Sequence, residues 1–246
     1  MVEHKLLLLT LVTFGSFITS LTGLGGGSLI LAGLLLLFPP EMALPLHSFT
    51  QLTANGLRAG LFFKSVHWRV VGAYAAFMLP FAWVGAEIFH LINPSALKIL
   101  VGSLILISIL PLKIKPIGEP HLKTFVFLGG LSGFLGIFVG AVGPMVTPFF
   151  NRLKVSRDGM ISTKSAGQMF LQLSKILAFS GAAGINFSSL QDHIGILVFG
   201  SLVGVGVSIP ISRKISDNRF NQVINILLAF ISIKILLEGI RELFNA

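Results

Sequence analysis

The sequence predicts an all-α polytopic membrane protein that contains an inverted repeat, each half being a glycine-broken re-entrant hairpin followed by three transmembrane helices. Three observations predict it: an apolar composition, two apolar runs too long for one span, and internal similarity at a fixed offset. The chain of 246 residues is 54% hydrophobic and 11% charged, whereas a soluble domain carries about 25% charged residues. No long polar segment separates the apolar runs, so we expect a single membrane domain over residues 1–246.

The composition also excludes several functions. There is no cysteine, so disulfides, thiolate metal sites and cysteine catalysis are excluded. The net charge of +9 comes mostly from short loops between apolar runs, which is a topology signal in a membrane protein rather than a sign of nucleic-acid binding. The first apolar run has no clear signal-peptide cleavage site, so we expect it to be retained. We find no Walker loop, metal-ligand cluster or catalytic-triad spacing, so the sequence predicts neither an enzyme nor a cofactor.

Eight apolar blocks approach or exceed the about 20 residues that a membrane span needs; they cover residues 6–38, 45–63, 70–92, 95–112, 124–150, 160–184, 188–211 and 220–243. The first would be about 50 Å long as one helix, whereas the hydrocarbon core is about 30 Å thick. Both long blocks are interrupted by glycine, as "GLGGG" at 23–27 and "GIFVGAVGP" at 136–144. We therefore expect a hairpin in each, with a short helix restarting near Gly27–Ser28 and near Gly143–Pro144.

The two glycine interruptions align when the sequence is shifted by 117 residues against itself. Gly26 then falls on Gly143, and Gln51 falls on Gln168. Polar matches in register inside apolar segments predict a twofold internal repeat. The repeats are expected over approximately residues 5–113 and 122–243.

The distribution of basic residues distinguishes two topologies. If every block crosses the membrane once, lysine and arginine divide seven against seven between the two sides. If the two long blocks return to their own side, the division is 11 against 3, which the positive-inside rule favours. The chain then has six full spans in the cytoplasmic (inner) membrane, with both termini outside. Each half crosses three times, so the second half is inverted, as in many secondary transporters with a site near the midplane.

Two of the blocks carry matching polar stripes. His47, Gln51, Asn55 and Arg58 are spaced to share one helix face. Lys164, Gln168, Gln172 and Lys175 repeat the spacing in the second half. Amides also hold membrane helices together, and basic residues near helix ends can extend to the interface. The duplication of the whole stripe favours a functional role, because intramembrane polar residues are costly.

The hairpin tips add the N-termini of the restarting helices, where free N–H groups and the helix dipole favour an anion. Proline at a first helical position and serine near a cap suit such ends. The predicted substrate-binding residues are Gly25, Gly26, Gly27, Ser28, Gln51, Asn55, Arg58, Gly143, Pro144, Gln168, Gln172 and Lys175. Candidates for gating or proton coupling are His47, Lys164 and Glu87, although interfacial placement is the alternative for Glu87. Lys234 and Glu238 are expected to pair across one helical turn.

The stretch "SLTGLGGGSLILAG" with its polar span, and "LGIFVGAVGPMVTPFF" with the span that follows, resemble the TauE/SafE family of sulfite exporters over nearly the whole chain. The family signature is a GxGGG run followed by proline, once in each half. The first copy here keeps the glycines but has Leu31 and Ala32 where proline is expected, and the second keeps Pro148 but has "AVGP" in place of the triple glycine. The resemblance implies a transporter of sulfite or of a related sulfur oxyanion or organosulfonate.

The expected mechanism is alternating access around a midplane site, with an inorganic or organosulfur anion and the lipid bilayer as partners. Protons are a candidate coupling ion, since sulfite is a weak acid in the physiological range. The direction of transport and the oligomeric state stay open. Two alternatives also stay open: a transporter of another anion such as a carboxylate, and a membrane subunit that scaffolds a partner. The loops are short, which argues against the scaffold.

Overall fold

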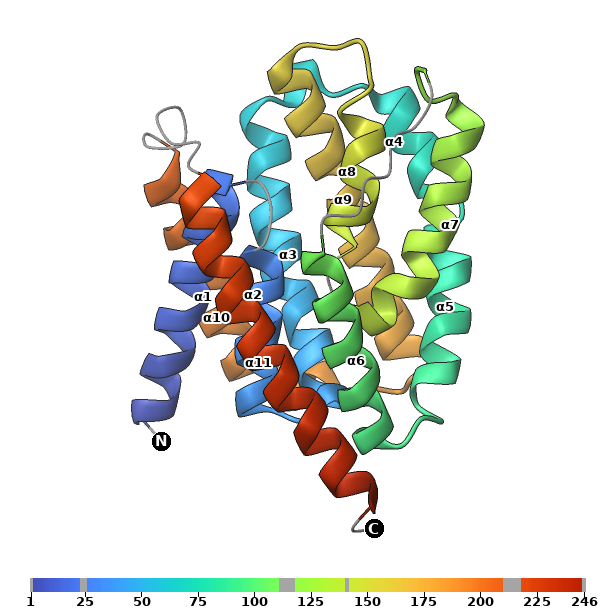
Figure 1. Ribbon diagram of the computed structural model, residues 1–246. Helices are drawn as coiled ribbons and strands as arrows, with labels where there is room; N and C mark the ends of the chain where they lie inside the picture. The colour runs from blue at the N-terminus through green and yellow to red at the C-terminus, as the bar shows by residue number, and fades with distance from the viewer. Residues whose placement is uncertain (1, 23–25, 111–117, 140–141, 210–217, 245–246) are drawn as a thin grey trace.

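The computed structural model describes residues 2–22, 26–110, 118–139, 142–209 and 218–244, and all regular structure in these ranges is helical (Figure 1). The α-helices are α1 (Val2–Thr22), α2 (Gly26–Leu37), α3 (Pro40–Leu61), α4 (Trp68–Ala75), α5 (Met78–Phe89), α6 (Pro94–Ile109), α7 (Leu122–Val139), α8 (Gly143–Phe150), α9 (Arg157–Gly181), α10 (Gln191–Ser208) and α11 (Asn218–Phe244). Short 3₁₀ helices cover η1 (Phe63–Ser65) and η2 (Phe187–Leu190).

The first long block folds back on itself. The helices α1 and α2 lie side by side, and the ring of His4, near the start of α1, contacts the ring of Phe38, directly after α2, at a centroid distance of 5.6 Å. The chain therefore returns to the end at which it began, which is the lower end in Figure 1. The break at residues 23–25 lies outside the described residues, and α2 begins at Gly26, close to the predicted restart.

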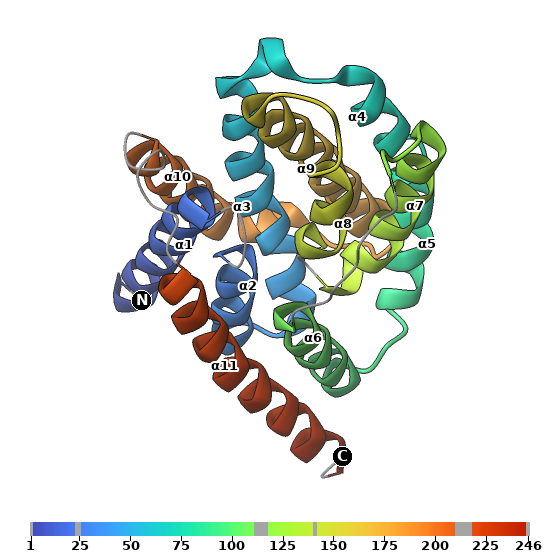
Figure 2. The ribbon, with the colours of Figure 1, turned by 45° about the horizontal axis from the view of Figure 1, so that its top comes forward.

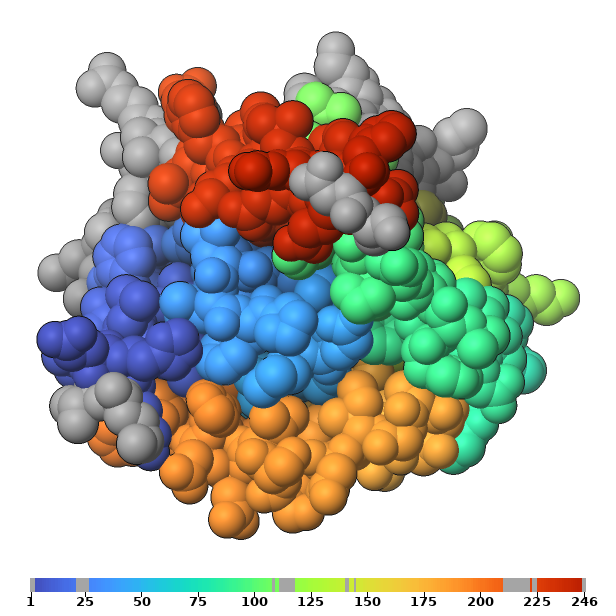
Figure 3. All heavy atoms as spheres, turned by 90° about the horizontal axis from the view of Figure 1, so that it is seen from below, coloured from blue at the N-terminus to red at the C-terminus, as the bar shows by residue number. Residues whose placement is uncertain are grey.

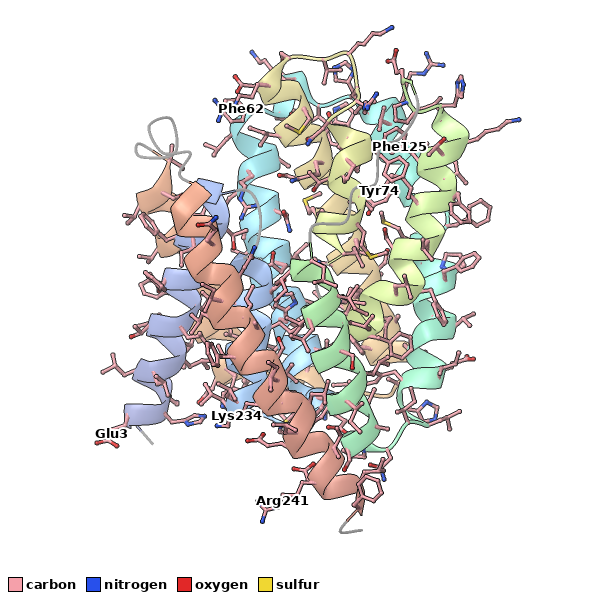
Figure 4. The ribbon with its side chains drawn as sticks, in the orientation of Figure 1. Glu3, Phe62, Tyr74, Phe125, Lys234 and Arg241 are labelled. Atoms are coloured by element: carbon pink, nitrogen blue, oxygen red, sulfur yellow. The ribbon has the colours of Figure 1, made fainter. Side chains whose placement is uncertain are left out.

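The second long block repeats this arrangement at the opposite end of the molecule. The rings of Phe125, near the start of α7, and of Phe150, at the end of α8, contact each other at 5.0 Å. Phe125 lies near the upper end of the molecule, whereas Glu3 of α1 lies near the lower end (Figure 4). The helix α8 begins at Gly143, where the restart was predicted. The preceding residues 140–141 lie outside the described residues.

The centre of the bundle is formed by α3 and α9, which pack along their length in opposite directions. Figure 2 shows α3, α8 and α9 between α1 and α10 on one side and α4, α5 and α7 on the other. The helix α9 begins at the upper end, where the Ser156 side chain caps it by accepting a hydrogen bond from the backbone N–H of Gly159 (3.1 Å). The two polar stripes thus lie on the two central helices.

The outer helices pack in pairs: α1 on α10, α7 on α4 and α5, and α6 on α11. Two of these contacts depend on glycine. A methyl group on Gly129 of α7 would overlap the carbonyl of Tyr74, and one on Gly204 of α10 would overlap the carbonyl of Thr13. Small residues allow membrane helices to approach this closely. The block predicted over 70–92 is divided into α4 and α5 by a break at residues 76–77.

Within the described residues, three helical segments are long and apolar enough to cross a membrane: Trp68–Phe89, Leu122–Val139 and Phe187–Ser208. Shorter apolar helices cover Gly27–Leu37 and Pro94–Ile107. Large apolar side chains face outward, including Phe127 and Phe230, which are 69% and 71% exposed. Such a surface is stable in lipid and not in water. The predicted class, an all-helical multi-pass membrane protein, is confirmed.

Ion pairs join helix ends at the lower end of the molecule. Lys5 pairs with Asp192 at 3.0 Å, and Lys98 pairs with Glu242 at 2.5 Å. The predicted pair of Lys234 with Glu238 is present on α11 at 3.7 Å. Seen from below, atoms of the chain around the start of α3 fill the centre of this face between α11 and the segment around η2 (Figure 3).

Candidate functional site

The two polar stripes are buried where α3 and α9 pack together. His47 and Lys175 are fully buried, and the four amide side chains, Gln51, Asn55, Gln168 and Gln172, are at most 7% exposed. Arg58 and Lys164 are half-buried. Lysine is almost never fully buried unless it is paired. A buried lysine and a buried histidine between two helices therefore need an explanation beyond packing.

The opposite directions of α3 and α9 determine which residues of the stripes face each other. His47 lies within electrostatic reach of Lys175, and Arg58 lies within electrostatic reach of Lys164. Between these pairs, Gly56 lies against Met169, whose sulfur would be 3.7 Å from a methyl group on the glycine. In this register Gln51 lies near the level of Gln172, and Asn55 near the level of Gln168. The site has two levels, which we call the His47–Lys175 level and the Arg58–Lys164 level.

The α3 stripe is held against the first hairpin. His47 Nε2 donates a hydrogen bond to the carbonyl oxygen of Gly27 (2.9 Å), because a carbonyl can only accept. The amide of Gln51 also lies close to this glycine, 3.3 Å from where a side-chain carbon would begin. Further up the helix, Arg58 Nε donates to Ser20 Oγ of α1 (3.3 Å). A residue larger than glycine at position 27 would press on the Gln51 amide.

The α9 stripe is held against the second hairpin in the corresponding way. Lys164 Nζ donates to Thr147 Oγ1 of α8 (3.4 Å), and the threonine hydroxyl donates to the carbonyl oxygen of Gly143 (2.6 Å). At the other end of the stripe, the Lys175 stem lies against Gly136 of α7, where a methyl group on the glycine would be 3.6 Å from the lysine Cδ. Each stripe thus contacts both arms of its own hairpin.

Several buried polar atoms of the stripes have no hydrogen-bond partner among the described residues; they are His47 Nδ1, Gln51 Nε2, Arg58 Nη2, Gln172 Oε1 and Lys175 Nζ. More than 90% of buried polar groups in folded proteins are paired, so such a group of exceptions calls for an explanation. All but the Arg58 atom lie at the His47–Lys175 level. Two of these atoms are donors, the Lys175 ammonium and the Gln51 N–H, and together they can bind a small anion. Gln172 Oε1 accepts, as does His47 Nδ1 while Nε2 carries the ring proton, so these two atoms suit a donor such as a hydroxyl group of the ligand.

The Arg58–Lys164 level is largely paired within the protein. Gln168 Nε2 donates to Tyr74 Oη (3.1 Å), and the tyrosine hydroxyl donates to Ser132 Oγ (2.8 Å). Asn55 Nδ2 donates to the carbonyl oxygen of Gln51 on its own helix (2.9 Å). These two amides therefore already have protein partners.

The chain matches a family of known proteins over most of its length. The profile of the sulfite exporter TauE/SafE family matches residues 7–235. The chain belongs to this family. Membership confirms the resemblance noted in the sequence and implies a membrane exporter of sulfite or a related sulfur anion, in a family of transporters rather than enzymes. No curated protein and no solved structure shows significant similarity to the chain.

The other predicted residues of this TauE/SafE protein are placed as follows. Ser28 is buried inside α2, which begins two residues earlier, so it does not occupy the position before the helix. Gly26 and Pro144 lie in the first turns of α2 and α8, and Gly25 lies outside the described residues. Glu87 is exposed near the end of α5 and lies outside the buried stripes.

Tyr74 and Ser132 belong to the site but were not predicted from the sequence. Tyr74 is the only tyrosine of the chain, it is fully buried, and its hydroxyl joins α4, α7 and α9. A lone tyrosine in an apolar block is a usable signal, because its hydroxyl must find a partner when buried. Which partner it finds depends on helix packing that the sequence does not specify.

Proposed function

We propose that this protein is a secondary transporter that moves sulfite, or a related sulfur oxyanion or organosulfonate, by alternating access around the paired stripes of α3 and α9. The observation that carries the proposal is the fully buried Lys175, whose Nζ has no hydrogen-bond partner among the described residues. The donor Gln51 Nε2 is likewise buried and unpaired in the described part of the chain. An ammonium group in a low-dielectric site is stabilised by a nearby anion.

The chemistry of the site suits a small oxyanion. Lys175 supplies a compact point charge, while the guanidinium of Arg58 can donate two parallel hydrogen bonds to two oxygens. Gln51 adds a neutral donor beside the Gly27 backbone. We assign binding to the His47–Lys175 level, with Arg58 drawing the anion along the stripe.

The inverted repeat is supported by the pattern of helix contacts. The long arm of the first hairpin, α1, packs on α10 of the second half, and the long arm of the second hairpin, α7, packs on α4 and α5 of the first half. Equivalent helices of the two halves also pack on each other, α3 on α9 and α6 on α11. Exchanging the halves leaves these large contacts unchanged, which is what a twofold axis between them requires. Rocking of one half against the other would then expose the stripes alternately.

The re-entrant topology is supported by the loops at the upper end. Alternate crossing of all eight blocks would separate the loop at 64–69 from the loop at 151–157. Instead the backbone N–H of His67 donates to Thr163 Oγ1 near the start of α9 (3.0 Å), and Lys154 pairs with Glu119 (3.1 Å). These loops at the upper end are rich in basic residues. We therefore infer that the upper end of the molecule faces the cytoplasm and that both termini lie outside.

Flux into and out of proteoliposomes tests the function directly. The substrate panel is sulfite, sulfate, an alkyl sulfonate and a small carboxylate, each measured with and without a pH gradient. Saturable flux of sulfite or the sulfonate supports the proposal, and dependence on the gradient would establish proton coupling. Preference for the carboxylate would mean that the substrate is a carboxylate and not a sulfur anion. Absence of flux for all four anions would favour the scaffold alternative.

A further inference from the structure

The upper end of the molecule contains a second site, separate from the buried stripes. A cavity of about 630 Å³ opens there between three segments: residues 67–70 at the start of α4, residues 119–122 at the start of α7, and Leu153 after α8. His67, Arg69 and His121 line it. These side chains take no part in the proposed transport site, because they belong to exposed loops and helix ends.

The electrostatics of this cavity favour an anion. Arg69 has no carboxylate within ion-pair distance among the described residues, and the lining carboxylate, Glu119, is already paired with Lys154 at 3.1 Å. Further basic residues lie close to these segments along the chain, namely Lys64, Lys123, Arg152 and Arg157. Figure 4 shows nitrogen-tipped side chains gathered at this end. The cavity therefore has a free guanidinium in a positive surrounding field.

The rim of the cavity is apolar and exposed. Trp68 and Leu122 line it and are 44% and 43% exposed. The Trp68 ring contacts the Phe63 ring at a tilt, with centroids 5.2 Å apart. Tryptophan beside basic residues at the end of membrane helices is typical of the headgroup level of a bilayer. A soluble anion needs no such rim, whereas a phospholipid presents a phosphate and acyl chains together.

We propose that this cavity binds the phosphodiester headgroup of an anionic phospholipid. Arg69 holds the phosphate, His67 and His121 add donors, and the acyl chains leave over Trp68 and Leu122. Basic pockets between membrane helices on the cytoplasmic side bind anionic headgroups by this chemistry. The lipid would connect α4 and α7 at the point where the two halves of the protein meet.

Native mass spectrometry of the purified full chain, titrated in detergent with phosphatidylglycerol or phosphatidylcholine, tests the proposal. Loss of the charge-assisted contact in Arg69→Gln should weaken phosphatidylglycerol binding about tenfold. Phosphatidylcholine carries the same phosphate but also a choline cation that the basic surroundings repel, so it should bind more weakly than phosphatidylglycerol to the wild-type protein. Arg69→Lys should fall between wild type and Arg69→Gln, because lysine keeps the charge and loses the planar fork. The control is Lys64→Gln, which removes one positive charge at the same end but outside the cavity lining.

Thermal melting in the same detergent without added lipid shows whether each variant is folded. A folded Arg69→Gln that binds phosphatidylglycerol like wild type would overturn the proposal. An equal loss in Lys64→Gln would also overturn it, because the effect would then be general surface charge. A third arm adds sn-glycerol 3-phosphate as a soluble competitor. Displacement of phosphatidylglycerol at equal concentration would show that the cavity binds soluble phosphates and not lipid. None of these measurements uses flux, so a failure of the lipid-binding proposal can be distinguished from a failure of the proposed transport function.

Discussion

The two polar stripes have the same order of residue types, basic, amide, amide, basic, but they are not bonded alike. In the α3 stripe the first amide, Gln51, keeps an unpaired buried N–H and the second, Asn55, is bonded to its own helix. In the α9 stripe the first amide, Gln168, is held by Tyr74, and the second, Gln172, has an unpaired buried oxygen. The two stripes, alike in sequence, thus have opposite assignments of the paired and unpaired amide.

The antiparallel packing gives this difference a meaning. Because α3 and α9 run in opposite directions, the unpaired amides of the two stripes lie near the same level, beside His47 and Lys175. The paired amides lie at the other level, with Tyr74. Under the proposed function, the His47–Lys175 level binds the anion and the Arg58–Lys164 level fixes the helices. Variants at each level test whether the two levels have these different roles.

The largest effect is expected from Lys175→Met. Methionine fills a similar volume without a charge, so the site loses its buried cation, and losing one partner of a buried charged contact costs about 3 kcal/mol or more. Sulfite flux in proteoliposomes should fall at least about a hundredfold. The melting temperature should hold or rise, because an uncompensated buried charge is removed.

Lys234→Met is the matched control for this change. Lys234 is exposed on α11, and its one ion-pair partner among the described residues is Glu238, one turn away. Flux in Lys234→Met should therefore match wild type. Wild-type flux in Lys175→Met would contradict the proposal that the anion binds at the His47–Lys175 level.

A smaller effect, and one that separates the two levels, is expected from alanine at the amides. Gln51→Ala removes an N–H that is free to donate to the anion and should raise the KM for sulfite about tenfold. Asn55→Ala removes an amide that already bonds within α3 and should change the KM less than about threefold. Initial rates over a sulfite concentration series measure both. Equal effects of the two variants would mean that the levels are not functionally distinct.

The two hairpin tips also differ in how closely a side chain approaches their glycine. A methyl group at Gly27 would lie 3.3 Å from the Gln51 amide, whereas one at Gly143 would meet nothing within 4 Å among the described residues. Gly27→Ala should therefore displace Gln51 and raise the KM several-fold, up to about tenfold. Gly143→Ala should leave the KM within about twofold, because the substitution meets open space. A larger effect of Gly143→Ala would place the anion at the second hairpin instead of the first.

The sequence predicted which residues lie on the two polar stripes, but not which of them form hydrogen bonds within the protein. The helical spacing placed His47, Gln51, Asn55 and Arg58 on one face, and the repeat placed Lys164, Gln168, Gln172 and Lys175 on its counterpart, because periodicity along a helix is a local property. Which amide is paired depends on contacts between helices far apart in the chain, and the sequence could not supply these. The break between α4 and α5 was also missed, although the sequence carries a signal for it. Pro80 has no N–H to bond the carbonyl of Ala76, four residues earlier, and its ring clashes with that carbonyl, which favours a helix break at Ala76–Phe77. Glu87 was a candidate because of its type, but the packing of α5 leaves it exposed.

The smallest effect on transport is expected from Tyr74→Phe, which tests whether the Arg58–Lys164 level is structural. The change removes only the hydroxyl that bonds Gln168 and Ser132, leaving two buried partners unpaired, so the protein should lose about 1–3 kcal/mol of stability. The ring keeps its edge contact with Phe150 (5.4 Å), so packing of α8 should persist. The KM for sulfite should stay within about twofold of wild type, because Gln168 is not assigned to the anion. Thermal melting in detergent measures the first quantity, and flux at a temperature well below the transition measures the second. A KM that rises as far as in Gln51→Ala, with unchanged melting, would show that Gln168 binds substrate and that both levels form one longer site.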